Sequence, residues 1–275
     1  MERTLTLEFE IEMKRLLEAI NLKYDYDFRN YSASSIGRTL VHAMNRMGCP
    51  TLSLLQDRVL RDSECFDELL QSLTIPVSEM FRDPTYFLAL REKVIPILKT
   101  YPSLKVWVAG CSTGEEVYSL AILLHEEGLL ERTILYATDI NPRSLKKAEA
   151  GVFSLEEIQR ATPNYSQSGG RGALSDYYTT TLGSAQFDEA LKRNVTFTDH
   201  SLVTDAVFSE THLISCRNVL IYFDRELQDR VFGLFLESLC RKCFLGLGSK
   251  ETLQFSKHAE HFDPFVKRDR IFRKK

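Results

Sequence analysis

Hydrophobic positions follow a helical period along the first quarter of the chain. Between residues 5 and 72, apolar residues recur at spacings of three and four, which is typical of helices that bury one face. The tripeptide at residues 48–50, Gly-Cys-Pro, separates two of these stretches, because proline disfavours helical conformation in the residue before it. The pattern predicts a small all-helical N-terminal domain over residues 1–73, with its clearest helices at LEFEIEMKRLLEAI, SSIGRTLVHAMNRM and CFDELLQSL.

From residue 104 onward the pattern changes to short apolar strands that alternate with amphipathic helices. The predicted strands are KVWVAG, RTILYATD, NVTFTD, THLISC, CFLGLG and DRIFRK. The predicted helices are GEEVYSLAILLHEEG, NPRSLKKAEAG and DRELQDRVFGLFLESLC. This alternation predicts an α/β domain over residues 104–275, built on a doubly wound, mainly parallel sheet with helices on both faces.

Two stretches fall outside these patterns. Residues 74–103 are expected to be a linker between the two domains. Residues from about 159 to 192 are polar, rich in glycine and serine, and break the alternation of strands and helices. There we expect either a loop or a small subdomain inserted into the connections of the sheet.

Composition and charge exclude several classes of protein. The chain of 275 residues has a net charge of −3, whereas a general nucleic-acid binder usually has a basic excess, so no nucleic-acid partner is predicted. No stretch is apolar and long enough to be a signal peptide or a membrane span, and we expect a cytoplasmic protein without membrane insertion. The six cysteines are expected to be reduced thiols. Cys240 and Cys243 form a lone CxxC, and no metal site is predicted.

The first strand, turn and helix of the α/β domain form the candidate ligand site. Gly110 and Gly114 bracket the turn with the spacing G-x-x-x-G, which differs from the G-x-G-x-x-G of dinucleotide-binding proteins. The second strand ends on Asp139, where a carboxylate can accept hydrogen bonds from both hydroxyls of a ribose. Asp139 could instead cap the helix that begins near Asn141.

Two adjacent carboxylates at the start of that helix indicate the kind of ligand. Glu115 and Glu116 would repel the phosphates that a helix N-terminus otherwise attracts. Glu115 would instead favour a nucleoside with a cationic amino-acid tail, such as S-adenosylmethionine. The two carboxylates could also simply complement the helix dipole, and both interpretations can hold together.

Four blocks of sequence, in order from Leu73 to Asp224, resemble the signatures of CheR-type chemotaxis receptor methyltransferases. They are LTIPVSEMFRDPTYF, VWVAGCSTGEEVYSLAI, YATDINPRSLKKAEAGVF and HLISCRNVLIYFD. The resemblance implies a helical N-terminal domain joined to a Rossmann-like methyltransferase domain with a small β-subdomain. It also implies an activity, the methyl esterification of glutamate side chains on the cytoplasmic helices of chemoreceptors. S-adenosyl-L-methionine would be the cofactor and S-adenosyl-L-homocysteine the product.

Matching this sequence to the family's motifs implies a set of site residues. Glu115 is expected to bind the methionine amino group and Asp139 the ribose, while Ser201 and Leu202 flank the adenine. The other cofactor-binding positions that the resemblance implies are Pro76, Ser78, Arg82, Gly110, Arg217 and Asn218.

The sequence departs from the family pattern at three places. Pro76 and Ser201 each stand where relatives have asparagine, and Pro76 has no N–H to donate. Family members that dock on a receptor's C-terminal pentapeptide use the edge of their small sheet. Between Tyr165 and Lys192 no clean three-strand pattern is visible, and tethering by a pentapeptide is therefore not predicted.

Arg82 and Tyr222 are the expected catalytic residues. A glutamate carboxylate has a pKa of about 4.3, so it is already a nucleophilic anion at neutral pH and needs no general base. Arg82 would hold one carboxylate oxygen while the other attacks the methyl group, unless it forms an ion pair with Asp83 or Glu79. Tyr222 would orient the carboxylate or line the path of the methyl group, unless it is a core tyrosine.

Other functions and partners stay open at this point. The alternative function is a regulatory module that binds the cofactor without turnover. A nicotinamide-dependent oxidoreductase is disfavoured by the G-x-x-x-G spacing and by Glu115. Arginines of the helical domain could form a docking face for acidic receptor helices, namely Arg38, Arg46, Arg58 and Arg61.

Overall fold

The computed structural model describes residues 6–74 and 78–275, and these divide into two compact units. The first unit comprises the described residues up to 74 together with Tyr222–Arg230. The second unit comprises the rest of the described chain.

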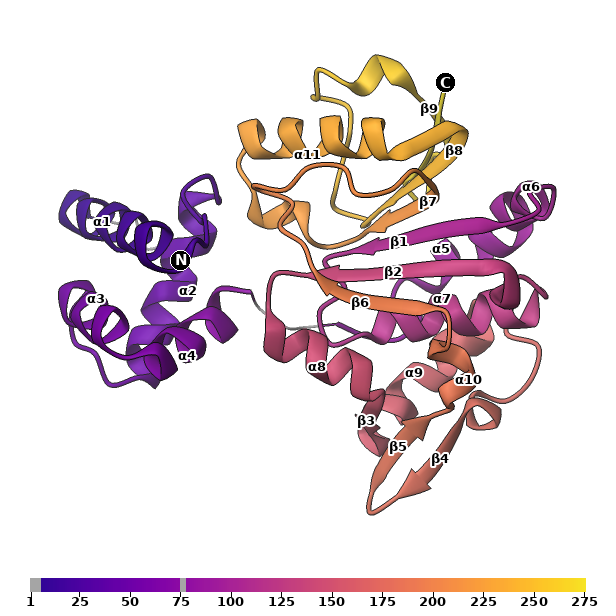
Figure 1. Ribbon diagram of the computed structural model, residues 1–275, viewed down its shortest axis with the longest axis horizontal. Helices are drawn as coiled ribbons and strands as arrows, with labels where there is room; N and C mark the ends of the chain where they lie inside the picture. Colours follow the sequence, from indigo (N-terminus) through magenta and orange to yellow (C-terminus); the bar gives the residue numbers. More distant parts are fainter. Residues whose placement is uncertain (1–5, 75–77) are drawn as a thin grey trace. The chain divides into compact units, whose positions relative to one another are not determined.

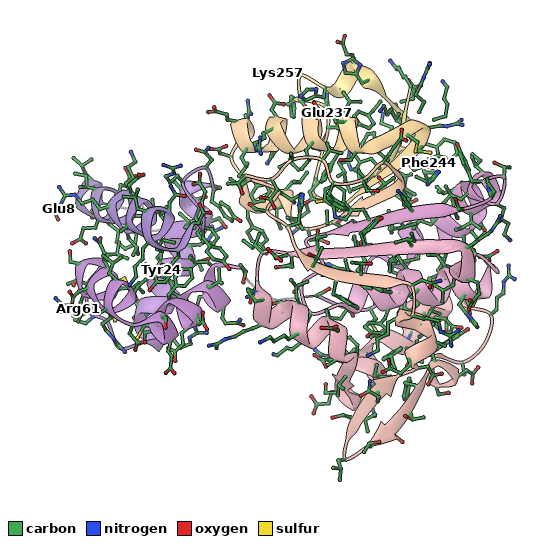
Figure 2. The ribbon with its side chains drawn as sticks, viewed as in Figure 1. Glu8, Tyr24, Arg61, Glu237, Phe244 and Lys257 are labelled. Carbon is green, nitrogen blue, oxygen red and sulfur yellow. The ribbon has the colours of Figure 1, made fainter. Side chains whose placement is uncertain are left out.

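The described N-terminal part of the first unit is all-helical, as the sequence predicts (Figure 1). Its helices are α1 (Leu7–Tyr24), α2 (Ala33–Arg46), α3 (Leu52–Arg61) and α4 (Ser63–Leu73). Thr6, Thr51 and Asp62 cap α1, α3 and α4, each accepting a hydrogen bond from a backbone N–H two or three residues onward. The ring of Tyr24, labelled in Figure 2, stacks on Phe66 with centroids 3.8 Å apart and so joins α1 to α4.

A segment from much later in the chain completes this unit. The backbone N–H of Ser32 donates to the carbonyl of Tyr222 at 2.8 Å, and the N–H of Asp224 donates to the carbonyl of Asn30 at 3.0 Å. Tyr31 and Phe223 pair as an isolated bridge, with their rings edge to face at 4.9 Å.

The second unit is built on a seven-stranded sheet in the order β6-β2-β1-β7-β8-β10-β9 (Figure 1). Its strands are β1 (Leu104–Ala109), β2 (Thr133–Asp139), β6 (Val195–Asp199), β7 (Thr211–Cys216), β8 (Leu239–Leu247), β9 (Phe262–Val266) and β10 (Ile271–Lys274). The pairs from β6 to β8 are all parallel, and β10 and β9 extend the sheet in antiparallel fashion. The mainly parallel sheet is therefore confirmed.

Helices cover both faces of the sheet, which explains why its interior strand β1 is apolar on both sides. Val106 and Val108 of β1 belong to one core cluster with the apolar face of α7 (Glu115–Glu126). Trp107, between them, faces the other way, and its ring lies 5.5 Å from that of Phe235 on α11 (Arg225–Ser238). The chain also contains α8 (Pro142–Ala150) and the short helical turns η2 (Leu130–Arg132), η4 (Leu220–Tyr222) and η5 (Ala259–His261).

The segment expected to be a linker contains helical turns that pack into the second unit. They are α5 (Pro84–Ala89), a π-helical turn η1 (Leu90–Val94) and α6 (Ile95–Leu98). Phe87, Leu90 and Ile95 are buried in the same core cluster as α7. Pro84 and Pro96 obscured the pattern, although proline suits the first turn of a helix.

The segment between β2 and β6 contains a small three-stranded antiparallel sheet of order β3-β5-β4. Its elements are β3 (Val152–Ser154), α9 (Leu155–Gln167), η3 (Leu174–Tyr177), β4 (Tyr178–Thr181), β5 (Ser184–Phe187) and α10 (Glu189–Lys192). The sequence did not reveal three strands between residues 165 and 192, because the third strand precedes α9 and is only three residues long. Of the two alternatives, the inserted subdomain is the one that the structure contains.

The described residues contain neither a membrane-spanning helix nor a candidate metal site. None of the helices there is long and apolar enough to cross a membrane. Across residues 6–74 and 78–275, no group of three or more histidine, cysteine, aspartate or glutamate side chains could hold a metal ion. All six cysteines, which lie within these ranges, are free thiols.

Candidate functional site

The candidate site lies where parallel strands of the second unit end. Gly110 directly follows β1, Asp139 ends β2, Ser201 follows β6 and Arg217 directly follows β7. Because these four strands are parallel neighbours, their carboxyl ends meet at one edge of the sheet. The structure thus brings the sequence-predicted residues of the second unit to one place in the fold.

The turn after β1 requires its two glycines. Gly110 has a φ of +74°, and a Cβ there would lie 2.5 Å from Cγ2 of Val219. Gly114, the N-cap of α7, has a φ of +98°, and its Cβ would lie 2.9 Å from the backbone of Ala148. Side chains at either position would combine backbone strain with a clash. The turn is therefore fixed in a shape that leaves its backbone N–H groups close to the strand ends.

Glu115 is a buried carboxylate in the first turn of α7. The hydroxyl of Thr113 lies 2.7 and 2.8 Å from its two oxygens, and the hydroxyl of Ser78 also hydrogen-bonds to it. Burial raises the pKa of Glu115 above its ordinary value. Among the described residues no cation pairs with it, so an incoming ammonium group would find an uncompensated carboxylate.

Asp139 holds the glycine turn to the start of α8. One of its oxygens accepts from the N–H of Ser112 at 2.8 Å, and the other accepts from the N–H of Asn141 at 2.9 Å. The cap of α8 is Asn141 itself, whose side chain accepts from the N–H groups of Arg143 and Ser144. Burial raises the pKa of Asp139. Asp139 therefore does not cap α8, and a carboxylate with about four acceptor sites keeps capacity for a ribose hydroxyl.

Ser112 is a polar residue of the turn that the sequence analysis did not select. Its φ is +51°, and its buried hydroxyl has no hydrogen-bond partner among the described residues. A buried hydroxyl without a partner is costly, and a polar ligand beside Asp139 would satisfy it. Nothing in the sequence distinguishes this serine, because the signal is its backbone conformation.

Arg82 occupies a strained stretch of backbone. The residues on either side, Phe81 and Asp83, both have positive φ, at +52° and +56°. Within residues 6–74 and 78–275 the guanidinium of Arg82 makes no hydrogen bond or ion pair, so the alternative of an ion pair with Asp83 or Glu79 is not what the structure shows. The carboxylate of Asp83 is instead bound by Arg217 at 2.8 Å.

Arg217 directs its donors into the protein. One terminal nitrogen donates to Glu116 at 3.0 Å, and the other donates to the carbonyl of Arg82 and to Asp83, both at 2.8 Å. The side chain is 1% exposed, and its Nε has no partner in the described part of the chain. The predicted cofactor contact of Arg217 stays a prediction, and the geometry shows a residue that holds the backbone around Arg82.

Asn218 lies in a turn that a second buried carboxylate organises. Asn218 has a φ of +62°, and its N–H donates to Glu251 at 3.1 Å. Glu251 also accepts from the N–H groups of Val219, Leu220 and Gly248 at 2.9, 2.7 and 2.6 Å. Sequence analysis missed Glu251, because an acid 33 residues beyond its partner gives no local signal. The predicted contact of the Asn218 side chain with the cofactor stays a prediction.

The remaining candidates are placed less directly. The hydroxyl of Ser201 accepts from the N–H groups of Val203 and Thr204, both at 3.2 Å, so it caps the turn after β6, while Leu202 is buried. Tyr222 belongs to the first unit, and its assignment rests on the resemblance. Pro76 lies outside the described residues.

The donor set fits a nucleoside with a cationic tail. Glu115 provides a buried anion, Asp139 provides acceptors for a ribose, and the orphaned hydroxyl of Ser112 lies between their segments. The glycine turn fits the approach of a ligand to its backbone, but the two carboxylates oppose a pyrophosphate. The fold and the site together define a Rossmann-like, S-adenosylmethionine-dependent methyltransferase.

Comparison with known proteins specifies the family. Residues 76–270 match the family described as CheR methyltransferase, SAM binding domain, and residues 11–74 match CheR methyltransferase, all-alpha domain. A protein called Cher3 from Pseudomonas putida is 61% identical over 265 residues, which cover 96% of this chain and 97% of that one. This chain belongs to the CheR methyltransferase family, which confirms the resemblance read from the sequence, and its cofactor is S-adenosylmethionine.

More distant relatives carry a name that refers to chemotaxis. The chemotaxis protein methyltransferase of Listeria monocytogenes is 28% identical over 229 residues, which cover 82% of this chain and 84% of that one. The protein of the same name from Borreliella burgdorferi is 30% identical over 211 residues, which cover 72% and 71%. The chain is therefore similar to chemotaxis methyltransferases along most of its length.

Proposed function

We propose that this protein transfers the methyl group of S-adenosylmethionine to glutamate side chains on the cytoplasmic helices of chemoreceptors. The observation that carries the proposal is the guanidinium of Arg82, which has no partner in the described chain although its backbone is firmly held. The N–H of Phe81 donates to the hydroxyl of Ser119 at 2.9 Å, and that hydroxyl donates to the carbonyl of Glu115 at 2.6 Å. Arg82 is thus linked through two hydrogen bonds to the residue expected to bind the cofactor's ammonium.

The residues of this chain would align and desolvate the acceptor. When bound, S-adenosylmethionine supplies a methyl group that its positively charged sulfur makes electrophilic. Arg82 would bind one oxygen of a glutamate carboxylate and leave the other oxygen free to attack. Because that carboxylate is ionised at neutral pH, its alignment and loss of water are the main tasks left to the enzyme. We also propose that Tyr222 orients the carboxylate or lines the path of the methyl group, and this role rests on the family resemblance alone.

The proposal extends to location and partners. Because the proposed acceptor helices lie in the cytoplasm, we propose that this protein is cytoplasmic as well. Three of the arginines considered for docking bind within the helical unit: Arg46 donates to the carbonyl of Glu68, Arg58 donates to the carbonyl of Met47 and Arg61 pairs with Asp57. Arg38 is exposed. These contacts weaken the idea of a broad arginine face but leave catalysis unaffected.

The small three-stranded sheet bears on whether the enzyme is tethered to a receptor's C-terminal pentapeptide. It was not predicted because three strands were not visible in the sequence, and that reason is now removed by β3, β5 and β4. The proposed activity requires only that the acceptor carboxylate reaches Arg82, and it holds with or without a tether.

The decisive experiment is calorimetric titration with S-adenosylhomocysteine. Asp139→Ala should weaken binding by tenfold or more, a loss of about 1.4 kcal/mol, because the ribose loses its acceptors. Asp139→Asn, which keeps one acceptor for the turn, should fall between this variant and the wild type. Glu237→Ala is the matched control, since Glu237 is exposed on α11 (Figure 2).

Transfer of labelled methyl groups to receptor membranes then tests turnover. Base-labile methyl esters on receptor glutamates are the expected product. Binding without any transfer would favour the alternative function, a module that binds the cofactor without turnover. No binding in the wild type would contradict both.

A further inference from the structure

Glu116 is the carboxylate that the cofactor site does not use. Its neighbour Glu115 faces Thr113 and Ser78, whereas Glu116 accepts from the hydroxyl of Ser215 at 2.6 Å and from Arg217 at 3.0 Å. The side chain of Glu116 is 13% exposed. Its position on α7 therefore points it to the end of β7 and to the backbone around Arg82.

The environment of Arg217 is built around this one ion pair. The hydroxyl of Tyr86 lies 2.8 Å from that of Ser215, and because Ser215 gives its proton to Glu116, Tyr86 is the donor to Ser215. The guanidinium of Arg217 lies over the ring of Tyr86 at 4.1 Å. Arg217 can thus occupy only one orientation, with Glu116 on one side and residues 82 and 83 on the other.

The same guanidinium holds the strained segment. It binds the carbonyl of Arg82 and the carboxylate of Asp83, in a segment where Phe81 and Asp83 adopt positive φ. Strain of this kind persists only where surrounding contacts impose it. Arg217 also removes the carboxylate of Asp83 as a partner for the Arg82 side chain.

We infer that Glu116, through Arg217 and Asp83, is a positioning residue that presents Arg82 to the acceptor carboxylate and keeps its guanidinium free. This inference rests on the proposed function. We call Glu116, Arg217 and Asp83 the Arg217 clamp. A buried ion pair contributes little net stability compared with apolar residues of similar volume, so a role in orientation is the better account of it here.

A double-mutant cycle with Arg82 separates positioning from general structural support. Glu116→Gln keeps the shape of the side chain but can accept from only one of Ser215 and Arg217. It should lower kcat/KM for methyl transfer at least tenfold in the wild-type background. In an Arg82→Lys background, where the guanidinium fork is already absent, the same change should cost less than threefold. Affinity for S-adenosylhomocysteine should stay within threefold of the wild type.

The controls distinguish the possible outcomes. Glu237→Gln, an exposed change of the same type, should leave transfer unchanged. If Glu116→Gln does not fold, Asp83→Asn weakens the same clamp, because a neutral amide replaces the carboxylate that Arg217 binds at 2.8 Å. Equal losses in both Arg82 backgrounds, no loss at all, or a parallel loss of cofactor affinity would overturn the inference. A wild-type enzyme that binds S-adenosylhomocysteine but transfers no methyl group would contradict the proposed function itself.

Discussion

Gly110 is a residue of the candidate site where a single added carbon should be costly. The positive φ and the 2.5 Å approach to Val219 act together at this position. Gly110→Ala should therefore lower the free energy of unfolding by about 2–4 kcal/mol, from strain and overpacking combined. Gly183→Ala is the matched control, because Gly183 has a φ of +80° but open space around it.

Urea titrations of the two variants measure the difference. The control should lose only about 1 kcal/mol, the cost of the backbone conformation alone. Similar losses at both positions would show that the contact with Val219 relaxes freely.

Residues whose roles depend on local sequence were the predictable ones. Gly110, Glu115 and Asp139 belong to short strand–turn–helix motifs, and the structure places them together. Glu251 and Ser112 were not predictable, because one acts on a turn 31–33 residues away and the other depends on its φ. For Arg217 the motif gave its neighbourhood, but only the geometry shows which way its donors point.

At the level of elements, a buried charge network attaches the inserted subdomain to α7. Glu126 accepts from the hydroxyls of Tyr165 and Tyr177 at 2.5 and 3.0 Å, and pairs with Arg91 of η1 at 2.6 Å. Its neighbour Glu127 pairs with Arg91, Lys99 and Arg171. Hydrogen bonds join α7 to α9, and ion pairs join it to the turn η1, in addition to apolar packing.

This network should make stability depend on pH. Burial alone would raise the pKa of Glu126 and Glu127, but hydrogen bonds and cations hold both pKa values below the ordinary one. A lowered carboxylate pKa in the folded state gives stability that is present above the unfolded pKa of about 4.3 and is lost as the pH falls below it. Glu126→Gln should therefore be less stable than the wild type at pH 7, by about 1–3 kcal/mol.

The difference in free energy of unfolding between the wild type and Glu126→Gln should become smaller as the pH falls. Denaturant titrations between pH 7 and pH 3 would measure it. Glu237→Gln should give a curve parallel to that of the wild type, since its carboxylate is exposed. A constant difference between Glu126→Gln and the wild type at every pH would contradict the role of the ionised form.

Helices and strands with a strong hydrophobic period were predictable from the sequence, whereas short or proline-containing elements were not. The long helices and the central strands follow their apolar pattern. Strand β3 has three residues, too few to show alternation, and helices α5 and α6 begin with proline-containing turns. Their structure is decided by packing against α7 and α9, which a single sequence does not reveal.

For the whole molecule, the two units can be followed separately. The single tryptophan, Trp107, is fully buried in β1 of the second unit, so its fluorescence reports on that unit. The cofactor residues of the second unit should make its unfolding sensitive to ligand. S-adenosylhomocysteine at a hundred times its Kd should stabilise it by about 2.7 kcal/mol and raise the tryptophan-detected Tm by about 5–10 °C.

The comparison ligands make this measurement specific. At the same ligand concentration Asp139→Ala should reduce the shift by half or more, because tenfold weaker binding lowers the stabilisation to about 1.4 kcal/mol. NAD should cause no shift in the wild type. A Tm that does not respond to S-adenosylhomocysteine would count against the cofactor site in this unit.

The segment Tyr222–Arg230 has a consequence for how the protein is made. The helices of the first unit are synthesised first, yet Asn30, Tyr31 and Ser32 acquire their partners only when residues 222–224 emerge. By then the strands β1, β2, β6 and β7 have already left the ribosome. A fragment that stops at residue 74 would lack this late contribution, and we expect it to expose part of its core around Phe28 and Tyr31. The N-terminal helices are thus translated before the strands of the second unit, but their fold is completed only after those strands have emerged.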